Sequence, residues 1–375
     1  MATLRALLEL FMLDSTQRTY LAALKKSGQF DRAFYRRQNP QLWRPYLLFP
    51  ERHYIVHGET AGLFPNRGFS PRAYVRLNRA VSASEPALLQ YLQAGQPADQ
   101  QTLDPSPVSG RWRARVPDIV VRAPQHRLAA VIHIYYPELW SELDDHLQAS
   151  GLKFDRLITI TDVGPQASKL KQAIGERYPK DQVWLMPNHG RDVFPWVTLI
   201  NSGALDAYQA VCKLHTKRSP HLREGAAWRR ALLAGLLPPK ASARLVKAFL
   251  EDDTSALLVT AAQHLKGPQW WGANQTRAAE LLARRSIELD PEALDFPAGS
   301  MFWVKPTLLT SIQRLELSAE DFEPELGGTD GSTAHAFERV LGYLARHQGQ
   351  TIAHAERMLA HALGTDHVPE CPSAH

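Results

Sequence analysis

The chain has 375 residues, of which 44% are hydrophobic and 22% are charged, as is typical of a soluble globular protein. No stretch approaches the roughly 18 to 20 uninterrupted apolar residues of a membrane-spanning helix. Residues 1–12 carry Arg5 and Glu9 and lack a small-residue cleavage site, so we expect no signal peptide. Cys212 and Cys371 stand in no metal-binding or redox spacing, which predicts a cytoplasmic protein without disulfides.

Positive charge is concentrated toward the amino terminus. Residues 1–127 contain 18 lysines and arginines against 9 aspartates and glutamates, whereas residues 128–375 contain 25 against 29. This imbalance predicts a surface that meets something anionic, such as the lipid headgroups at the inner face of the cytoplasmic membrane. Arginines solvated on helix surfaces are an equally good explanation. No RNA- or DNA-binding motif accompanies the charge, so nucleic acid is not an expected partner.

Residues 1–98 contain an imperfect duplication, which predicts a small helical domain built from one unit used twice. The matched positions are Phe30, Tyr35, Asn39, Tyr54 and Gly58 in the first copy and Phe69, Tyr74, Asn78, Tyr91 and Gly95 in the second. In each copy the first tyrosine follows the phenylalanine by five residues, and the glycine follows the second tyrosine by four. We expect packed aromatic faces, and helices that stop at Gly58 and Gly95.

Residues 99–125 are rich in proline and small polar residues and predict a linker, with one short strand at 119–121. In the second domain, residues 126–365, apolar runs alternate with helical segments. Strands are expected at 128–134, 156–161, 182–186, 208–214, 256–260 and 301–304, and helices at 137–150, 167–177, 195–202, 228–237, 241–250 and 332–346. The predicted fold class is therefore α/β, a mostly parallel sheet flanked by helices, preceded by the small helical domain.

The sequence has no glycine-rich nucleotide loop, serine hydrolase elbow or His-Glu-x-x-His zinc motif, so the loops that follow the strands form the candidate site. Asn188, Gly190, Arg191 and Asp192 follow the third predicted strand. Gly190 permits a turn with positive φ, and Arg191 offers a planar fork that matches phosphate oxygens. Asp192 accepts hydrogen bonds from sugar hydroxyls or holds the arginine. A purely structural Arg–Asp pair is the alternative.

Lys213, His215 and Lys217 occupy alternate positions at the end of the fourth predicted strand and point to one side if the strand continues. Two ammonium groups and an imidazole on one face are costly to assemble unless an anion lies among them. We expect that anion to be a diphosphate. A solvated basic turn is the alternative.

His133 and Tyr135 end the first predicted strand, and Asp162 follows the second. Since the carboxyl ends of parallel strands meet at one edge, these residues should lie beside the proposed ligand. A satisfied core histidine and a turn-forming aspartate are the alternatives.

Gly299, Ser300 and Met301 lead into the last predicted strand, and small residues there allow a ligand or another backbone segment to approach closely. If a ligand lies there, we expect these residues on the side of the site that binds a second substrate, the acceptor. Asp330 lies in a glycine-rich loop before the last predicted helix. We expect it to be a general base that deprotonates an acceptor hydroxyl. Alternatively, Asp330 or Ser332 is the N-cap of that helix.

Five blocks in this order resemble the rhamnan synthesis protein F family of bacterial glycosyltransferases, over about His126 to Gly349. They are the segments at 133–136, 188–195, 213–217, 296–303 and 330–339. The resemblance implies inverting transfer of L-rhamnose or a related deoxysugar from a nucleotide donor, dTDP-L-rhamnose, to a glycan or lipid-linked glycan acceptor. Arg191 and the loop at 213–218 would hold the diphosphate, Tyr135 and Asp162 the nucleoside, and Asp330 would activate the acceptor.

One departure from the usual pattern concerns the metal. Single-domain glycosyltransferases with the GT-A-like fold place an Asp-x-Asp metal site after the fourth strand, where this chain has Lys-Leu-His-Thr-Lys at 213–217. Fixed cations would then stabilise the departing diphosphate, and no metal cofactor is expected. The carboxylates at 251–253 could reach a divalent cation but are interpreted as solvated surface. A different donor sugar, or a non-catalytic glycan-binding scaffold, remains an alternative function.

Overall fold

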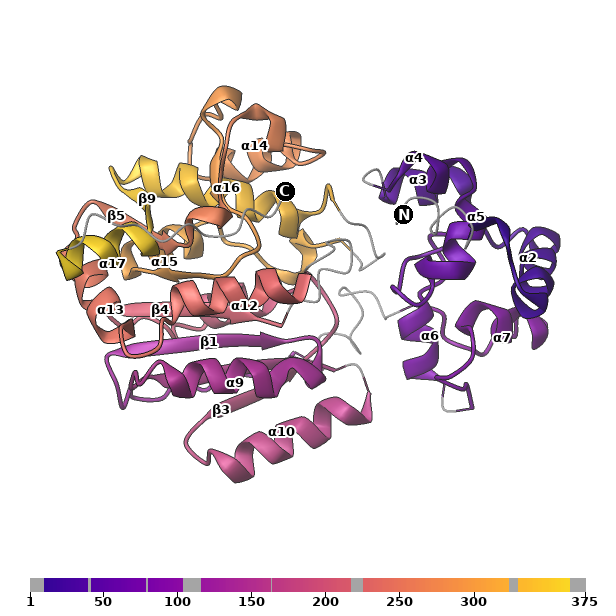
Figure 1. Cartoon of the computed structure of the whole chain (residues 1–375), viewed down its shortest axis with the longest axis horizontal. Helices are drawn as coiled ribbons and strands as arrows, with labels where there is room; N and C mark the ends of the chain where they lie inside the picture. Colours follow the sequence, from indigo (N-terminus) through magenta and orange to yellow (C-terminus); the bar gives the residue numbers. More distant parts are fainter. Residues whose placement is uncertain are drawn as a thin grey trace. The chain divides into compact units, whose positions relative to one another are not determined.

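The computed structural model describes residues 10–39, 42–78, 80–103, 116–162, 164–216, 225–323 and 330–364. The chain divides into unit 1, Met1–Ser106 with Pro324–Asp330, and unit 2, Pro107–Glu323 with Gly331–His375. The boundaries expected at 98 and 126 bracket this division. Among the described elements, unit 1 consists of helices and unit 2 of a sheet flanked by helices (Figure 1).

Unit 1 shows the structural basis of the duplication. Its elements are α2 (Ser15–Ser27), α3 (Arg32–Gln38), α4 (Arg44–Leu48), α5 (Pro50–His53), a π-helical turn (Tyr54–Gly58), α6 (Pro71–Leu77) and α7 (Ala87–Gln93). Asp31 and Ser70, which follow the repeated phenylalanines, cap α3 and α6 by accepting a hydrogen bond from the amide three positions on. Asn39 and Asn78 each donate to the carbonyl of the tyrosine four positions earlier, at 2.8 Å. Both copies therefore begin and end their first helix in the same way.

The repeated aromatic residues pack together, as predicted. In the first copy the ring of Phe30 lies 5.0 Å from Tyr35 and 5.6 Å from Tyr54, measured between centroids. In the second copy the corresponding distances from Phe69 are 5.2 Å to Tyr74 and 5.3 Å to Tyr91. Each unit thus has its own aromatic core.

The two repeated glycines differ. Gly95 has a φ of +78° after α7, as a helix stop requires. Gly58 also ends its helical segment, a π-helical turn over Tyr54–Gly58, but without positive φ. A Cβ atom at Gly58 would lie 2.3 Å from the hydroxyl oxygen of Tyr35, so glycine is needed there for close packing.

The sheet of unit 2 confirms the predicted fold class. Its strands are β1 (Leu128–Ile134), β2 (Asp155–Thr161), β3 (Gln182–Met186), β4 (Ala210–His215), β5 (Ser255–Val259), β8 (Phe302–Val304) and β9 (Thr351–His354). They lie in the order β3-β2-β1-β4-β8-β5-β9, and only the pairs that involve β8 are antiparallel. The short strands β6 (His264–Lys266) and β7 (Asp295–Pro297) form a separate antiparallel pair.

The strand order creates a switch point between β1 and β4. The chain leaves β1 toward β2 and β3 on one side, and β4 then returns to the other side of β1. His133 and His215 are paired in register at the carboxyl ends of these strands. Ligands of open α/β sheets bind in the crevice that such a reversal leaves.

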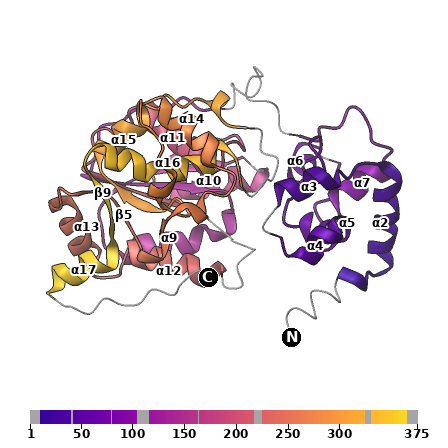
Figure 2. The ribbon, with the colours of Figure 1, turned by 90° about the horizontal axis from the view of Figure 1, so that it is seen from above.

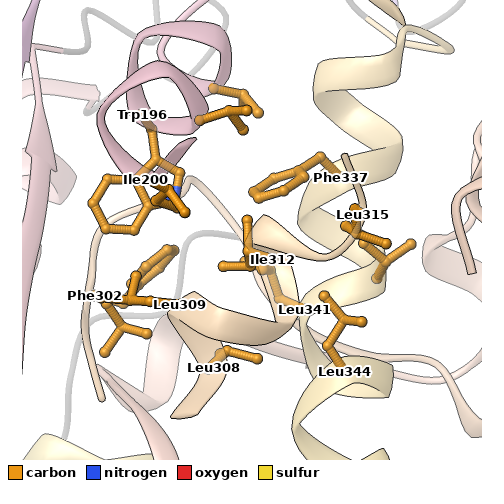
Figure 3. Close-up of a cluster of buried hydrophobic side chains, with 14 of the residues drawn as sticks. Trp196, Ile200, Phe302, Leu308, Leu309, Ile312, Leu315, Phe337, Leu341 and Leu344 are labelled. Carbon is orange, nitrogen blue, oxygen red and sulfur yellow. The ribbon is translucent and has the colours of Figure 1, made fainter. Parts of the chain in front are cut away.

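Helices cover both faces of the sheet (Figure 2). One face carries α11 (Val193–Asn201), α14 (Gln275–Ala283), α15 (Pro306–Gln313) and α16 (Thr333–His347). The other carries α9 (Trp140–Ala149), α10 (Pro165–Arg177), α12 (Gly225–Leu236), α13 (Ser242–Glu251) and α17 (Ala355–Leu363). Figure 3 shows the first core, where Trp196 of α11, Phe302 of β8, Ile312 of α15 and Phe337 of α16 converge.

Several local predictions differ from the structure. Residues 119–121 form no strand, and β4 begins at Ala210 rather than 208. The helices α14, α15 and α17 were not predicted, nor were the strands β6, β7 and β9, which have only three or four residues each. Cys212 is a buried free thiol, and Cys371 lies outside the described residues. Within the described ranges, no helix has the length and apolar content to cross a bilayer.

Candidate functional site

His133, at the end of β1, lies between two hydroxyl groups of β2. Its ring nitrogens are each 3.0 Å from a hydroxyl oxygen, one of Thr159 and the other of Thr161. The residue is 5% exposed, and burial is the main cause that lowers its pKa to about 3. His133 is therefore neutral near pH 7. The alternation of threonine with apolar residues along β2 was visible in the sequence and could have identified this contact.

The low pKa of His133 predicts an acid-sensitive unit 2. An unfolded histidine takes up a proton below about pH 6.5, whereas folded His133 stays neutral down to a pKa of about 3. Its stabilising contribution is therefore complete above pH 6.5 and falls between these pKa values by up to about 1.4 kcal/mol per pH unit. Urea unfolding at pH 7, 6 and 5 should show a smaller loss of stability for His133→Gln than for the wild type. Equal losses would contradict this assignment.

Lys213, His215 and Asp192 form a buried ionic cluster at the carboxyl end of β4. The ammonium nitrogen of Lys213 lies 2.5 Å from Oδ2 of Asp192 and 2.8 Å from the carbonyl oxygen of Ser300. Nδ1 of His215 lies 3.0 Å from the same Oδ2. Lys213 is 1% exposed and His215 is 7% exposed. One carboxylate therefore holds two basic side chains, and Lys213 connects the loop after β3 to the turn before β8.

The charges of this cluster compensate one another. Burial alone would raise the pKa of Asp192, but attraction and hydrogen bonds from His215 and Lys213 hold it well below its usual value. Asp192 is therefore ionised and neutralises Lys213. The sequence predicted an anion among these basic side chains, and the anion present is the chain's own carboxylate. The prediction that Lys213 offers its charge directly to a diphosphate is wrong, because its ammonium group is enclosed.

The loop after β3 has the predicted tight turn. Gly190 has a φ of +57°, and Arg191 has the same value, which is uncommon for a residue with a side chain. A Cβ atom at Gly190 would lie 2.6 Å from the Cβ of Phe194, so a larger residue does not fit. His189 is buried and donates from Nε2 to a backbone carbonyl at 2.8 Å. Asn188 and Arg191 are half-buried.

The turn before β8 brings part of the predicted acceptor side to the cluster. Gly299 has a φ of +84° and Ser300 a φ of +53°, and the Ser300 carbonyl accepts the hydrogen bond from Lys213. Met301 is fully buried in the core on the opposite face of the sheet, together with Trp303. The acceptor-side prediction for Met301 is therefore wrong, since it is a core residue.

Two buried polar atoms, one in this cluster and one in the turn that it contacts, have no hydrogen-bond partner within the described part of the chain. They are Nε2 of His215 and Oγ of Ser300. Because the Asp192 carboxylate only accepts, Nδ1 of His215 donates to it, and Nε2 is left without a partner among the described residues. Leaving such a group unpaired costs about 1 to 3 kcal/mol. A ligand hydroxyl could satisfy both atoms.

Thr216 joins the ends of β1 and β4 and was not singled out from the sequence. Its hydroxyl oxygen accepts from the amides of Tyr135 at 2.9 Å and Tyr136 at 3.0 Å, and its own amide donates to the carbonyl of His133 at 3.0 Å. The half-buried Tyr135 is thereby fixed at the switch point. Asp162 is half-buried after β2, and its amide donates to a carbonyl at the end of β3 at 2.8 Å.

Asp330 precedes α16 but is not its N-cap. The N-cap is Ser332, which forms a reciprocal capping box with His335. Asp330 is half-buried, two positions before the cap. The capping alternative thus belongs to Ser332, and the general-base role of Asp330 stays a prediction.

The remaining predicted positions are Lys217 and the carboxylate run at 251–253. Lys217 lies outside the described residues. In the carboxylate run at 251–253, Asp252 accepts hydrogen bonds from the hydroxyls of Thr254 and Ser255, each at 2.6 Å. It has a structural role at the start of β5. No group of three or more histidine, cysteine, aspartate or glutamate side chains in the described segments is placed to hold a metal ion.

A protein-family profile described as rhamnan synthesis protein F matches residues 113–350. The chain belongs to the rhamnan synthesis protein F family. All the site residues described above, from His133 to Asp330, lie within the matched region.

Individual relatives of this rhamnan synthesis protein F family member were found in sequence and in structure. Proteins named "Uncharacterized protein WxcX" from two strains of Xanthomonas campestris pv. campestris are 30% identical over 245 residues, which cover 65% of this chain and 35% of each relative. The chain thus spans about a third of the curated relatives it matches. The solved mannosyltransferase PcManGT from Pyrobaculum calidifontis, in complex with GDP-Man and Mn²⁺, is 14% identical, with a TM-score of 0.33 over 71% of this chain and 61% of that chain.

Proposed function

We propose that this chain is a glycosyltransferase of bacterial surface-polysaccharide synthesis that binds a nucleotide-sugar donor at the carboxyl edge of β1 and β4. The observation that carries the proposal is the buried Asp192–Lys213–His215 cluster at the switch point of the sheet. A compensated charge cluster with unpaired polar atoms is expensive to bury for stability alone. Membership in the rhamnan synthesis protein F family supports the choice of reaction.

In this proposal the donor diphosphate is bound by Arg191, in the turn before α11. Arg191 is half-buried and lies in a turn with two consecutive residues of positive φ, Gly190 and Arg191 itself. A planar guanidinium matches phosphate oxygens in a bidentate manner. Lys213 acts indirectly, because its bonds to Asp192 and Ser300 hold the two flanking loops in place. Tyr135 and Asp162 are proposed to contact the nucleoside.

The unpaired atoms of the cluster are proposed to bind hydroxyl groups of the donor sugar. Both atoms can form hydrogen bonds, so together they would orient a polyol rather than an apolar group. Asp330 is proposed to take the proton of an acceptor hydroxyl that attacks the anomeric carbon, which inverts its configuration. The proposed donor is dTDP-L-rhamnose, and the acceptor a glycan or lipid-linked glycan.

We also propose that no divalent cation takes part. The clustered side chains are a lysine, a histidine and one carboxylate already committed to both. Hard cations prefer several oxygen ligands, which this set does not supply. Arg191, with Lys217 beyond the described residues, would compensate the charge that develops on the leaving diphosphate.

A nucleotide panel tests the proposal. UDP, GDP and dTDP are added separately to the full chain in a thermal-shift assay, because a ligand that binds only the folded state stabilises it by about 2.7 kcal/mol at 100 times its Kd. We expect dTDP to raise the melting temperature, Arg191→Ala to abolish the shift, and Lys171→Ala, on the exposed side of α10, to keep it. A shift with GDP or UDP alone would indicate another donor.

Turnover of dTDP-L-rhamnose, UDP-glucose and GDP-mannose is then measured in the presence of EDTA. We expect transfer or slow hydrolysis of the rhamnose donor that EDTA leaves unchanged. Activity that EDTA removes and manganese restores would contradict the metal-free mechanism. No turnover with any donor, despite nucleotide binding, would favour a non-catalytic scaffold.

A further inference from the structure

A hollow with mixed apolar and basic walls lies in unit 1, beside α2. Its volume is about 610 Å³, and its walls include Phe11, Met12 and Leu21 together with Arg18, Lys25 and Arg52. Phe11 is 49% exposed and Met12 is 73% exposed. Large apolar side chains at such exposure, beside three cations for which the described residues show no ion pair, indicate an interaction surface rather than a packing defect. We call these six residues the α2 groove.

The sequence builds the α2 groove from one helix stripe and the segment before it. Arg18, Leu21 and Lys25 follow one another at helical spacing, on a side of α2 that adjoins the buried face of Tyr20 and Leu24. The capping box of α2 fixes where the helix begins, directly after the segment with Phe11 and Met12. The exposed face of α2 is therefore basic and the adjoining segment apolar.

Arg52 and Phe11 hold the other wall of the groove. The guanidinium of Arg52 donates to the carbonyl of Leu10 at 3.1 Å and lies 5.6 Å from the centroid of the Phe11 ring. Phe11 packs edge to face on Phe49, with 5.0 Å between centroids. Phe49 and Leu48 are themselves 37% and 63% exposed, which extends the apolar surface.

The charge of unit 1 is complementary to an anionic partner. Residues 1–98 contain 13 lysines and arginines against 6 aspartates and glutamates. None of the residues that line the groove is acidic. The nearest described carboxylates have other roles, since Asp14 caps α2, Glu51 pairs with Arg32 and Glu59 bonds to Tyr20.

We infer that the α2 groove docks unit 1 on an anionic phospholipid surface. Arg18, Lys25 and Arg52 meet lipid phosphates, while Phe11 and Met12 enter the boundary between headgroups and acyl chains. A soluble phosphate or nucleotide would satisfy the cations only, whereas a bilayer also removes the exposed apolar side chains from water. The inference does not depend on the proposed glycosyltransferase activity, because it concerns unit 1 alone.

Vesicle co-sedimentation of the full chain tests this inference. The probes are vesicles of phosphatidylcholine and vesicles with about one third phosphatidylglycerol, at low and high salt. We expect binding to the anionic vesicles only, and weaker binding at high salt because of the shorter Debye length. The variant Arg18→Glu/Lys25→Glu should lower the affinity at least about tenfold. Phe11→Ser/Met12→Ser should lower the binding that persists at high salt.

Arg37→Glu/Arg67→Glu is the matched control, since it changes the net charge equally at two exposed arginines outside the groove. Circular dichroism confirms that each variant is folded, and we expect the control to bind within about threefold of wild type. Equal loss in the control would overturn the inference, as would wild-type binding to neutral vesicles or none to anionic ones. A dimer in light scattering that Phe11→Ser/Met12→Ser dissociates would identify a second copy as the occupant and also overturn it.

Discussion

Replacement of Asp192 by asparagine should destabilise unit 2 by about 3 to 5 kcal/mol, the usual cost of leaving one member of a buried ion pair without its partner. The amide keeps the shape of the side chain but not its charge. The ammonium of Lys213, 1% exposed, would then have only the Ser300 carbonyl as a strong partner. Urea unfolding followed by tryptophan fluorescence measures the change. Asp206→Asn, at an exposed aspartate, is the control and should stay within about 0.5 kcal/mol of wild type.

A double variant distinguishes the effect of the buried charge on stability from the effect of the cluster on activity. In Asp192→Asn/Lys213→Met the buried charge is absent, so the double variant should be more stable than Asp192→Asn alone, by a coupling of about 1 to 3 kcal/mol. It should still lack activity, because the connection that Lys213 makes between Asp192 and the Ser300 carbonyl is then absent. If the effects of the two substitutions simply add, the pair is not energetically coupled and the cluster is not the organising feature of the site.

Replacement of Asp330 by asparagine should lower turnover by about 10² to 10⁴, the typical contribution of a general base, with nucleotide affinity nearly unchanged. Ser332 provides the control for the alternative that Asp330 only stabilises the start of α16, because Ser332 is the N-cap of that helix. Ser332→Ala should cost about 1 kcal/mol of stability and leave turnover per folded molecule close to wild type.

Both variants are assayed with the donor that shows turnover, and the folded fraction is measured in the same samples. A pH–rate profile adds a readout that a structural role would not change, since loss of the base removes the acidic limb. If Asp330→Asn behaves like Ser332→Ala, with lower stability and intact turnover per folded molecule, the general-base assignment is wrong. The search for the base would then turn to His215, whose Nε2 has no partner among the described residues.

The sequence alone was sufficient for the main elements of unit 2 and for the duplication in unit 1. The strand β1 is a nearly continuous apolar run, as expected of a strand buried on both faces, and the alternation of strands with helices implies parallel pairing. The duplication could be recognised in the sequence because both copies repeat the same positions. In each copy a polar side chain caps the first helix, aromatic residues pack together and an asparagine ends that helix.

The pattern also located the loops of the site, but it did not give their partners. The alternation of residues along β4 placed Lys213 and His215 on one face, and their charge predicted an anion beside them. Periodicity alone cannot identify which group that anion is. The same limit applies to Met301, whose neighbours in sequence face the cluster while its side chain enters the opposite core.

Only the tertiary structure decided which groups meet. The order of strands sets β1 beside β4 and inserts the antiparallel β8 between β4 and β5, so that Ser300 reaches Lys213 across 87 positions of sequence. Register then pairs His133 with His215 and lets one carboxylate, Asp192, neutralise the buried lysine. The physical reason is that the hydrophobic pattern of a sequence predicts how deeply a side chain is buried. Whether a buried charge is neutralised depends instead on which atom, distant in sequence, lies next to it.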